Sequence, residues 1–260
     1  MSLKLDNFIV NTISAYEKEK EIIDMWKKPP LTAVLSANHP QLYTLWKVVS
    51  PDHFLPEELL KGAKSIVVYF IPFEKRIIDS NLEGDDASVD WAEAYVYTND
   101  LFEYLNAKTS RYFEKFGFIA ESIKPSHNDK TLASRWSHRH IAWLAGLGTF
   151  GLNNMLITSK GCCGRINSFI TNADCIELDI PLLGDSALQA EKCLDKRKGR
   201  CGMCRRKCPA GAYDAQVNFS RHKCHEQCLK NGKNFKYLGK ADVCGKCLVG
   251  LPCSTEDPCA

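Results

Sequence analysis

The distribution of cysteine constrains this chain more than any other feature of its sequence. All 13 cysteines lie between Cys162 and Cys259, and ten of them lie between residues 193 and 260. Such density is typical of disulfide-linked secreted domains or of metal centres. A disulfide framework usually belongs to a short exported chain, whereas this chain has 260 residues, an odd number of cysteines and no signal-peptide pattern at its N-terminus. The sequence therefore predicts metal-bound thiolates in a reducing cytoplasm.

The rest of the composition is that of an ordinary soluble protein. Apolar residues make up 45% and charged residues 25%, which favours a globular fold over a disordered or membrane-bound chain. No apolar run approaches the roughly 20 residues that a membrane-spanning helix needs. The formal net charge of +3 is too small to argue for nucleic-acid binding by itself. We therefore expect no membrane partner.

Hydrophobic patterns predict alternating helices and strands in the cysteine-free part. Helices are expected over 12–28, where Pro29 and Pro30 would end the helix, over 98–117, capped by Thr98 or Asn99 and ended by Gly117, and over 134–146. Strands are expected over 65–73, 118–123, 155–159 and 166–171. This alternation predicts an α/β or α+β domain over residues 1–185.

The chain changes character near residue 190. The remainder has few long apolar runs and is rich in Cys, Lys, Gly and Arg. Such a segment is expected to need a metal centre to fold. We therefore predict a second domain over residues 186–260.

The cysteine spacing in this second domain resembles that of two-cluster ferredoxins. In that pattern three closely spaced cysteines hold one 4Fe–4S cluster, and a fourth, before proline, holds the other. The run Cys201-x2-Cys204-x3-Cys208-Pro209 keeps that order, and ten cysteines are enough for the eight thiolates of two clusters. The expected ligands of the first cluster are Cys193, Cys201, Cys204 and Cys253, and those of the second are Cys208, Cys224, Cys244 and Cys247. Cys228 could replace Cys224, and Cys259 is left over.

Zinc is the alternative metal, because paired CxxC units are also typical of zinc sites. Zinc would favour four or eight cysteines in separate knuckles and has no requirement for a Cys-Pro step. The pattern therefore favours iron–sulfur clusters.

Basic residues crowd the same region. Eight lysines and arginines stand between residues 192 and 207, against one acid, Asp195. They either form a solvated face that offsets the charge of the cluster, or they form a docking surface for an acidic electron donor or a nucleic acid.

The stretch Gly146–Gly151 matches the dinucleotide fingerprint G-x-G-x-x-G, but its context is wrong for that function. The fingerprint requires a strand before it and a helix after it, so that pyrophosphate meets the N-terminus of the helix. Here a predicted helix precedes the glycines and a predicted strand follows them. Nicotinamide binding is therefore not expected, and the glycines could simply turn a helix into a strand.

The sequence HRHIAWLAGLGTFGLNNMLIT, followed by GCCGRINSFIT and the cysteine module, resembles the epoxyqueuosine reductases. These are cobalamin-dependent iron–sulfur reductases related to the reductive dehalogenases. The segment LPEELLKGAKSIVVYFIPF also looks like an early segment of that family, and the resemblance covers roughly residues 50–255. It implies a corrinoid-binding N-terminal domain related to the nitroreductase-like fold, and a ferredoxin-like C-terminal domain that delivers electrons to cobalt.

The chain also departs from this family. Counting back from the glycine loop places Leu132 where the family has its catalytic acid, and the nearest acid is Asp129. Leu152 stands where the family has a lysine, and Cys162 and Cys163 stand where it usually has serine and aromatic residues. These departures argue against carrying over the reduction of an epoxide on tRNA.

Two functional hypotheses remain open. In the first, two clusters feed electrons to a corrinoid or directly to a substrate, and the electrons come from a ferredoxin or flavodoxin type of donor. The second is a non-catalytic electron carrier without cobalamin. Candidate proton donors for the first hypothesis are Asp129, His127, His138 and His140. Arg135 and Arg139, on the same predicted helix, could meet an anionic substrate or a corrinoid tail. The resemblance places the cofactor against Arg139, Gly146, Gly148, Gly151 and Asn153.

Overall fold

The computed structural model describes residues 3–128, 130–180, 189–213 and 219–260. Its helices are α1 (Leu5–Glu19), η1 (Pro40–Thr44), α2 (Leu45–Val48), α3 (Pro56–Leu59), α4 (Lys75–Ser80), α5 (Val89–Glu114), α6 (His138–Leu144), α7 (Leu194–Lys198), α8 (Met203–Arg206), α9 (Arg221–Gly232) and η3 (Lys233–Leu238). Its strands are β1 (Leu31–Ser36), β2 (Ser65–Pro72), β3 (Ala120–Ser122), β4 (His127–Asn128), β5 (Ala133–Ser134), β6 (Gly148–Phe150), β7 (Leu156–Thr158) and β8 (Gly164–Thr171).

A four-stranded antiparallel sheet in the order β1-β2-β8-β3 forms the centre of the molecule. Every residue of β2 is buried, which explains the continuous apolar run of its sequence. Alternate residues of β2 serve two separate cores: Val67, Tyr69 and Ile71 on one face, and Ile66 and Val68 on the other.

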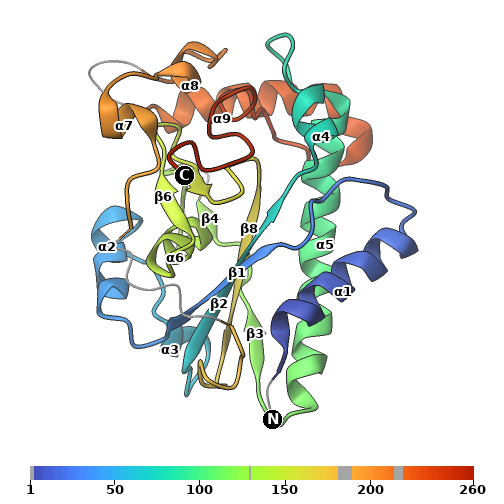
Figure 1. Ribbon diagram of the computed structural model, residues 1–260, viewed down its shortest axis with the longest axis vertical. Coiled ribbons are helices and arrows are strands. Elements are labelled where there is room, and N and C mark those ends of the chain that lie inside the picture. Colours follow the sequence, from blue (N-terminus) through green and yellow to red (C-terminus); the bar gives the residue numbers. More distant parts are fainter. Residues whose placement is uncertain (1–2, 129, 181–188, 214–218) are drawn as a thin grey trace.

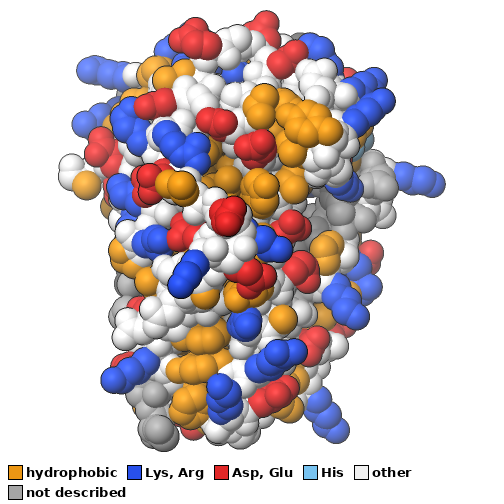
Figure 2. Space-filling model, turned by 90° about the vertical axis from the view of Figure 1, so that its right-hand side faces the viewer, with side chains coloured by type: hydrophobic (Ala, Val, Ile, Leu, Met, Phe, Trp, Pro, Cys, Tyr) orange, Lys and Arg blue, Asp and Glu red, His pale blue; other side chains and the backbone are white. Residues whose placement is uncertain are grey.

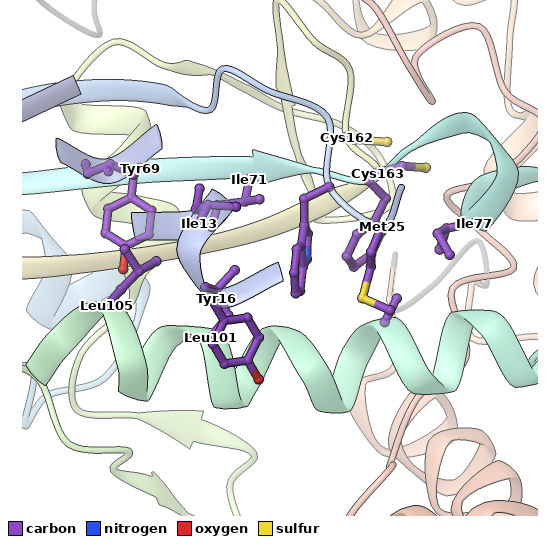
Figure 3. Packing of buried hydrophobic residues seen from close by; sticks show 14 of the residues in the cluster. Ile13, Tyr16, Met25, Tyr69, Ile71, Ile77, Leu101, Leu105, Cys162 and Cys163 are labelled. Carbon is purple, nitrogen blue, oxygen red and sulfur yellow. The ribbon is translucent and has the colours of Figure 1, made fainter. Parts of the chain in front are cut away.

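Helices cover both faces of this sheet (Figure 1). The long helix α5 lies on one face together with α1, and α6 lies on the other face with α2 and α3. Figure 3 shows the first core from close by, where Ile13 and Tyr16 of α1 and Leu101 and Leu105 of α5 face Tyr69 of β2. The mixed α/β architecture expected from the sequence is therefore confirmed.

The predicted strand over 65–73 and the left-handed stop at Gly117, with φ of 78°, are confirmed. The helix expected over 12–28 is wrong in its bounds, because α1 ends at Glu19 and Trp26 instead pairs with Phe73 at the edge of the sheet.

The bounds expected for the two later helices also need correction. The long helix does not begin at Thr98 or Asn99 but at Val89, where the Ser88 hydroxyl accepts a hydrogen bond from Trp91 N. Thr98 is buried inside this helix and its hydroxyl accepts from Trp26 Nε1 at 2.9 Å. The helix expected over 134–146 is limited to α6, so Arg135 lies outside it.

The cysteine-rich segment shares the core of the N-terminal part. Phe235, Ala241, Val243, Leu248 and Val249 are buried in the same cluster as α1 and α5. The segment therefore adds apolar surface to the N-terminal core, and its need for a metal centre to fold stays a prediction. The predicted domain boundary at residue 185 falls outside the described residues and stays a prediction.

A search of the described residues for a helix both long enough and apolar enough to cross a bilayer finds none.

Candidate metal centres and the adjoining polar site

Four cysteines from three chain segments line one cavity. Cys193 caps α7, Cys201 and Cys204 lie before and within α8, and Cys253 lies near the C-terminus. Burial, together with the nearby Cys253, Cys193 and Cys201, raises the pKa of Cys204 to about 11. We call these four residues the first thiol group. Gly151, Leu152 and Asn153 form the wall of the cavity that comes from the N-terminal part.

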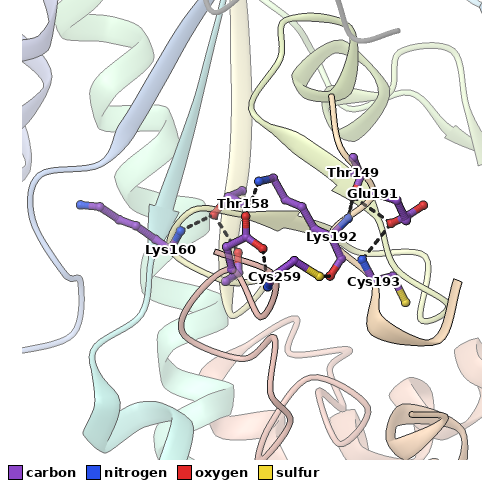
Figure 4. A network of polar contacts seen from close by, with 9 residues as sticks. Thr149, Thr158, Lys160, Glu191, Lys192, Cys193 and Cys259 are labelled. Carbon is purple, nitrogen blue, oxygen red and sulfur yellow. Dashed lines mark hydrogen bonds and ion pairs between the residues drawn. The ribbon is translucent and has the colours of Figure 1, made fainter. Parts of the chain in front are cut away.

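A polar network fixes the position of Cys193 against β6 (Figure 4). The carboxylate of Glu191 accepts hydrogen bonds from the Thr149 hydroxyl at 3.0 Å and from Cys193 N at 2.8 Å, and Lys192 N donates to Thr149 Oγ1 at 2.9 Å. Lys192 also pairs with Asp257. Cys259, left over by the spacing argument, makes a weak hydrogen bond to Lys192 O at 3.4 Å, so its side chain belongs to this network rather than to the cavity wall.

A second set of five cysteines gathers around α9. Cys224 and Cys228 lie one turn apart on this helix, and the hydrogen bond between their thiols lowers the pKa of Cys224 to about 7. Burial raises the pKa of Cys247 to about 12, and Cys224, Cys244 and Cys208 contribute to this shift. Cys208, Cys224, Cys228, Cys244 and Cys247 are named the second thiol group. Because the fold brings both Cys224 and Cys228 here, the choice between them stays a prediction.

The thiols surround space rather than converge on a point. Within the ranges that the structure describes, no three His, Cys, Asp or Glu side chains are close enough to hold a single metal ion. A zinc ion would require four thiolates at about 2.3 Å from one centre. In a 4Fe–4S cluster each iron takes one cysteine, so four thiols spaced around a cavity are compatible with such a cluster.

The loop Cys244–Cys247, of sequence CGKC, is built onto α4 and α5. Asn81 Nδ2 donates to Cys244 O at 2.9 Å, and the ammonium of Lys246, only 3% exposed, donates to Asn81 O at 2.9 Å and to Glu83 O at 2.7 Å. Gly245 has φ of 76°, and a Cβ there would lie 2.3 Å from the Trp91 ring. The second thiol group is therefore held rigidly by the N-terminal part.

Two candidate proton donors, His138 and His140, lie at the start of α6. His138 Nδ1 is 2.7 Å from Ser168 Oγ, and His140 Nδ1 is 2.7 Å from Ser137 Oγ. Burial, together with the charge of Arg165 near His138 and of Arg139 near His140, lowers the pKa of each imidazole to about 4. Both rings are therefore neutral at pH 7, which suits hydrogen bonding and not proton donation from an imidazolium.

The residues assigned to a cofactor by resemblance make contacts within the chain. Arg139 Nη1 donates to Asn154 O at 2.6 Å, and Asn153 Nδ2 donates to Cys247 O at 3.0 Å. A Cβ at Gly148 would lie 2.1 Å from Ile157 O, and one at Gly151 would lie 2.7 Å from Asn153 Oδ1. These two glycines are required by the close approach of β6 and β7 and do not present open backbone to a flat ligand. Gly146, with φ of 85°, ends α6.

The helix-to-strand turn expected at the glycine stretch is confirmed, and no helix follows Gly151 before β7. Asp129 lies outside the described residues. Leu132, at the position of the family's catalytic acid, adopts a left-handed backbone with φ of 52°.

Sequence reasoning missed two polar residues near α6. His53 Nε2 accepts a hydrogen bond from Ser137 N at 3.1 Å, although 84 residues separate them and nothing in the sequence connects them. Arg165 of β8 donates from Nη2 to Asn99 Oδ1 at 2.9 Å and lies over the Tyr95 ring at 4.4 Å. The available signal for Arg165 was that it is the one charged residue of β8.

Comparison with known proteins finds similarity to epoxyqueuosine reductases and to a reductive dehalogenase. The epoxyqueuosine reductase of Francisella cf. novicida (strain Fx1) is 24% identical over 178 residues, which are 66% of this chain and 45% of that protein. The structure of epoxyqueuosine reductase from Streptococcus thermophilus matches 94% of this chain and 66% of its own with a TM-score of 0.52 and 14% identity. A catabolic reductive dehalogenase in complex with 3-bromo-4-hydroxybenzoic acid matches 87% of this chain and 30% of its own, with a TM-score of 0.54 and 19% identity.

The resemblance to epoxyqueuosine reductases and reductive dehalogenases is confirmed.

The solved structures share the fold of this chain at low sequence identity. The chain spans about half the length of the curated relative, 45%. No family profile matches it.

Proposed function

We propose that this protein is an iron–sulfur oxidoreductase in which the two thiol groups hold two 4Fe–4S clusters that serve a reduction in the N-terminal part. Such clusters store and pass single electrons at low potential. The observation that carries the proposal is the first thiol group: four cysteines from three segments, in crossed ferredoxin order, lie around one cavity. The relatives, named as reductases, support the same class of chemistry.

The chain's own residues prepare both sites before any cluster is bound. Asp195 Oδ1 accepts a hydrogen bond from Cys201 N at 3.2 Å, and Glu191 orients Cys193. In the second thiol group, Ala212 N donates to Cys208 Sγ at 3.5 Å. Hydrogen bonds from backbone amides to cysteine sulfur stabilise thiolate and raise the potential of a bound cluster.

We also propose that an acidic electron donor, of ferredoxin or flavodoxin type, docks beside the first thiol group. The basic side chains of α7, α8 and the loop between them are exposed: Lys196, Arg197, Lys198, Arg200, Arg205 and Arg206. By contrast, basic and acidic side chains alternate over the face shown in Figure 2. A patch of basic side chains beside the first thiol group would steer an acidic protein to that group.

The second thiol group lies next to α6, where we place the reduction. The charges of Cys224 and Arg139 interact, and Arg221 of α9 acts on both Arg139 and His140. Arginines here would attract an anionic substrate, while the neutral imidazoles of His138 and His140 would orient it by hydrogen bonds. Asp129 remains the candidate proton donor from the sequence.

Cobalamin is the cofactor suggested by the relatives, one of which is described as a B12-dependent reductive dehalogenase structure. The glycine residues assigned to it do not fit, because Ile157 and Asn153 already fill the space in front of Gly148 and Gly151. We therefore propose direct reduction of a substrate beside α6 and take no step through a corrinoid.

The alternative function is a non-catalytic electron carrier. A specific observation favours it: the catalytic acid of the family is replaced by Leu132, which has no ionisable group. A carrier would hold both clusters but would show no substrate-dependent oxidation of its reduced form.

Anaerobic purification tests these proposals. Two clusters predict about eight iron and about eight sulfide per chain, together with the spectrum of 4Fe–4S centres. Stoichiometric zinc without sulfide would reject the iron–sulfur function. A corrinoid recovered in stoichiometric amount would overturn direct reduction, and reoxidation of the reduced protein by small anionic organic substrates would separate an enzyme from a carrier.

A further inference from the structure

The guanidinium of Arg165 is a charged group to which the proposed function gives no role. Arg165 is the second residue of β8, and its side chain is only partly exposed. Its Nη2 donates to Asn99 Oδ1 at 2.9 Å, whereas its Nη1 is buried and has no hydrogen-bond partner among the described residues. A buried donor of this kind is rare, because its lost hydration is not replaced by a hydrogen bond within the protein.

The charge of Arg165 is not neutralised in the parts of the chain that the structure describes. The ion pairs found there involve other residues, such as Arg76 with Asp90 at 3.7 Å. Arg165 Cζ lies 4.4 Å from the centroid of the Tyr95 ring, and such a cation–π contact holds a guanidinium without cancelling its charge. Burial lowers the pKa of Arg165, and Tyr95 offsets only part of that shift. This guanidinium is therefore a desolvated cation without an anionic partner.

The other side chains near Arg165 are neutral. The Phe102 ring of α5 lies 5.9 Å from Arg165 Cζ. Two residues along β8, Asn167 Nδ2 donates to Tyr69 Oη at 2.9 Å and to Asn106 Oδ1 at 3.3 Å. The facing surfaces of β8 and α5 thus combine aromatic, phenol and amide groups with one cation. Such a mixture suits an apolar ligand that has a single anionic group.

Arg165 lies in a stretch of β8 that is open on one side and adjoins α6. Because β3 pairs with β8 only at residues 169–171, residues 164–168 pair with β2 on one side and with no described strand on the other. In this stretch Ser168 Oγ lies 2.7 Å from His138 Nδ1, and the charge of Arg165 adds to burial in lowering the pKa of His138. Arg165 is therefore close to an imidazole that the proposed function assigns to the orientation of a substrate.

We propose that Arg165 is a specificity residue that binds the carboxylate of a small monocarboxylic acid with an apolar body. A carboxylate carries one negative charge at pH 7, which a single guanidinium balances, and its two oxygens match the fork of N–H donors. A phosphate monoester carries a charge of about −1.5 to −2 at that pH, more than this residue can balance. The inference rests on the proposed function for its assignment of this site to a substrate, so binding is measured separately from reduction.

Calorimetry of the anaerobically purified protein tests this role, with benzoate as the probe and benzamide as its neutral isostere. Benzoate should bind, and benzamide should bind about 10- to 100-fold more weakly, the size of a hydrogen bond to a charged group. Arg165→Gln should weaken benzoate binding by a similar factor. Arg165→Lys should restore part of the affinity, because it keeps the charge but not the fork of donors. Arg76→Gln, which removes an arginine of α4, should leave the affinity unchanged.

Asn99→Asp distinguishes ligand binding from a purely structural role of Arg165. The substitution is nearly isosteric and places a carboxylate beside Nη2, so the guanidinium gains an anionic partner within the protein. Benzoate affinity should fall as it does in Arg165→Gln, while the midpoint of thermal unfolding should rise. If Arg165→Gln fails to fold, Asn99→Asp decides the question. Wild-type affinity in a folded form of either variant would overturn the proposal.

The remaining outcomes separate this role from the proposed function. No binding of benzoate to the wild type, equal binding of benzamide, or tighter binding of phenyl phosphate would each reject a carboxylate site at Arg165. Arg165-dependent binding of benzoate by a protein that reduces no substrate would support this site and reject the proposed reduction. Reduction of uncharged substrates by a protein that does not bind benzoate would do the reverse.

Discussion

The two thiol groups are built in different ways. The first surrounds a cavity whose walls come from short helices, from the 251–253 loop and from the Gly151–Asn153 turn, with exposed basic side chains beside it. The second is held against α4 and α5 by the contacts of Asn81, Trp91 and Lys246 with the CGKC loop. One group adjoins exposed loops, and the other is attached to the most regular part of the molecule.

This difference suggests a division of tasks. A redox centre that receives electrons must be close to the surface and must attract its donor, which fits the first thiol group. A centre that passes electrons to a substrate must keep a fixed position relative to that substrate, which fits the second. The following predictions test the separation of the two groups, from the largest expected effect to the smallest.

The largest effect is expected from removing one ligand in each group. Cys204→Ser and Cys244→Ser should each lose one cluster, about four of eight irons, and should lose different ones. Iron analysis and electron paramagnetic resonance of each variant give the measurement. If the ligands are crossed, Cys253→Ser should lose the same cluster signal as Cys204→Ser. Cys208→Ser should lose the same signal as Cys244→Ser. If Cys204→Ser and Cys244→Ser lose the same signal, the two groups are not separate centres.

Reversing the charge beside the first group should slow electron delivery. In the double variant K198E/R200E, the rate of reduction by an acidic flavodoxin should fall by roughly tenfold at low salt, since steering changes association rates by about 10 to 10³. High salt should shrink the difference. The control variant K61E/K64E changes exposed lysines next to α3, at the other end of the molecule in Figure 1. An equal loss of rate in both variants would contradict a docking site at α7 and α8.

The free energy of unfolding should show that the second thiol group, unlike the first, is held against α4 and α5. Gly245→Ala places a Cβ against Trp91 at a φ of 76°. It should lower the free energy of unfolding by roughly 1–3 kcal/mol for overpacking and by roughly 1–2 kcal/mol for the left-handed backbone. Gly199→Ala, with φ of 64° and open space, should show the backbone cost alone. Urea unfolding curves provide the comparison, and equal losses would mean that the contact with Trp91 does not hold the loop.

The smallest effect concerns pH near α6. The folded pKa of His138 is about 4, below the unfolded value near 6.5, so the unfolded chain binds a proton that the folded chain rejects. Stability from this group is present above pH 6.5 and is lost as the pH falls from 6.5 toward 4. Between pH 7 and 5.5 the loss is at most about 1 kcal/mol for one histidine. In His138→Gln, the free energy of unfolding measured with urea should fall less between pH 7 and pH 5.5 than it does in the wild type. The same fall in both proteins would contradict a desolvated imidazole at His138.

Parts of the fold could be predicted from local sequence because local patterns decide them. The unbroken apolar run of β2 required a strand buried on both faces. The glycine stretch could be predicted to turn a helix into a strand, because a predicted helix precedes it and a predicted strand follows it. Helix starts were predicted less well: Thr98 has the residue type of a cap, but its hydroxyl donates to Ala94 O inside α5 and accepts from Trp26.

The candidate sites also contain features that the sequence predicts and features that it does not. Cysteine spacing predicts thiolate donors and a crossed order of ligands along the chain, and both stay predictions. It had no means of identifying His53 beside Ser137, because these residues are distant in the chain and no periodicity relates them.

The sequence by itself determined the mixed α/β class and the turn at the glycines, since residue chemistry and short-range periodicity are encoded locally. The tertiary structure alone decided that the cysteine-rich segment buries Leu248 and Val249 in the core of the N-terminal part. It also decided which thiols lie around the cavity. The reason is that long-range packing depends on how whole surfaces of the protein exclude water together.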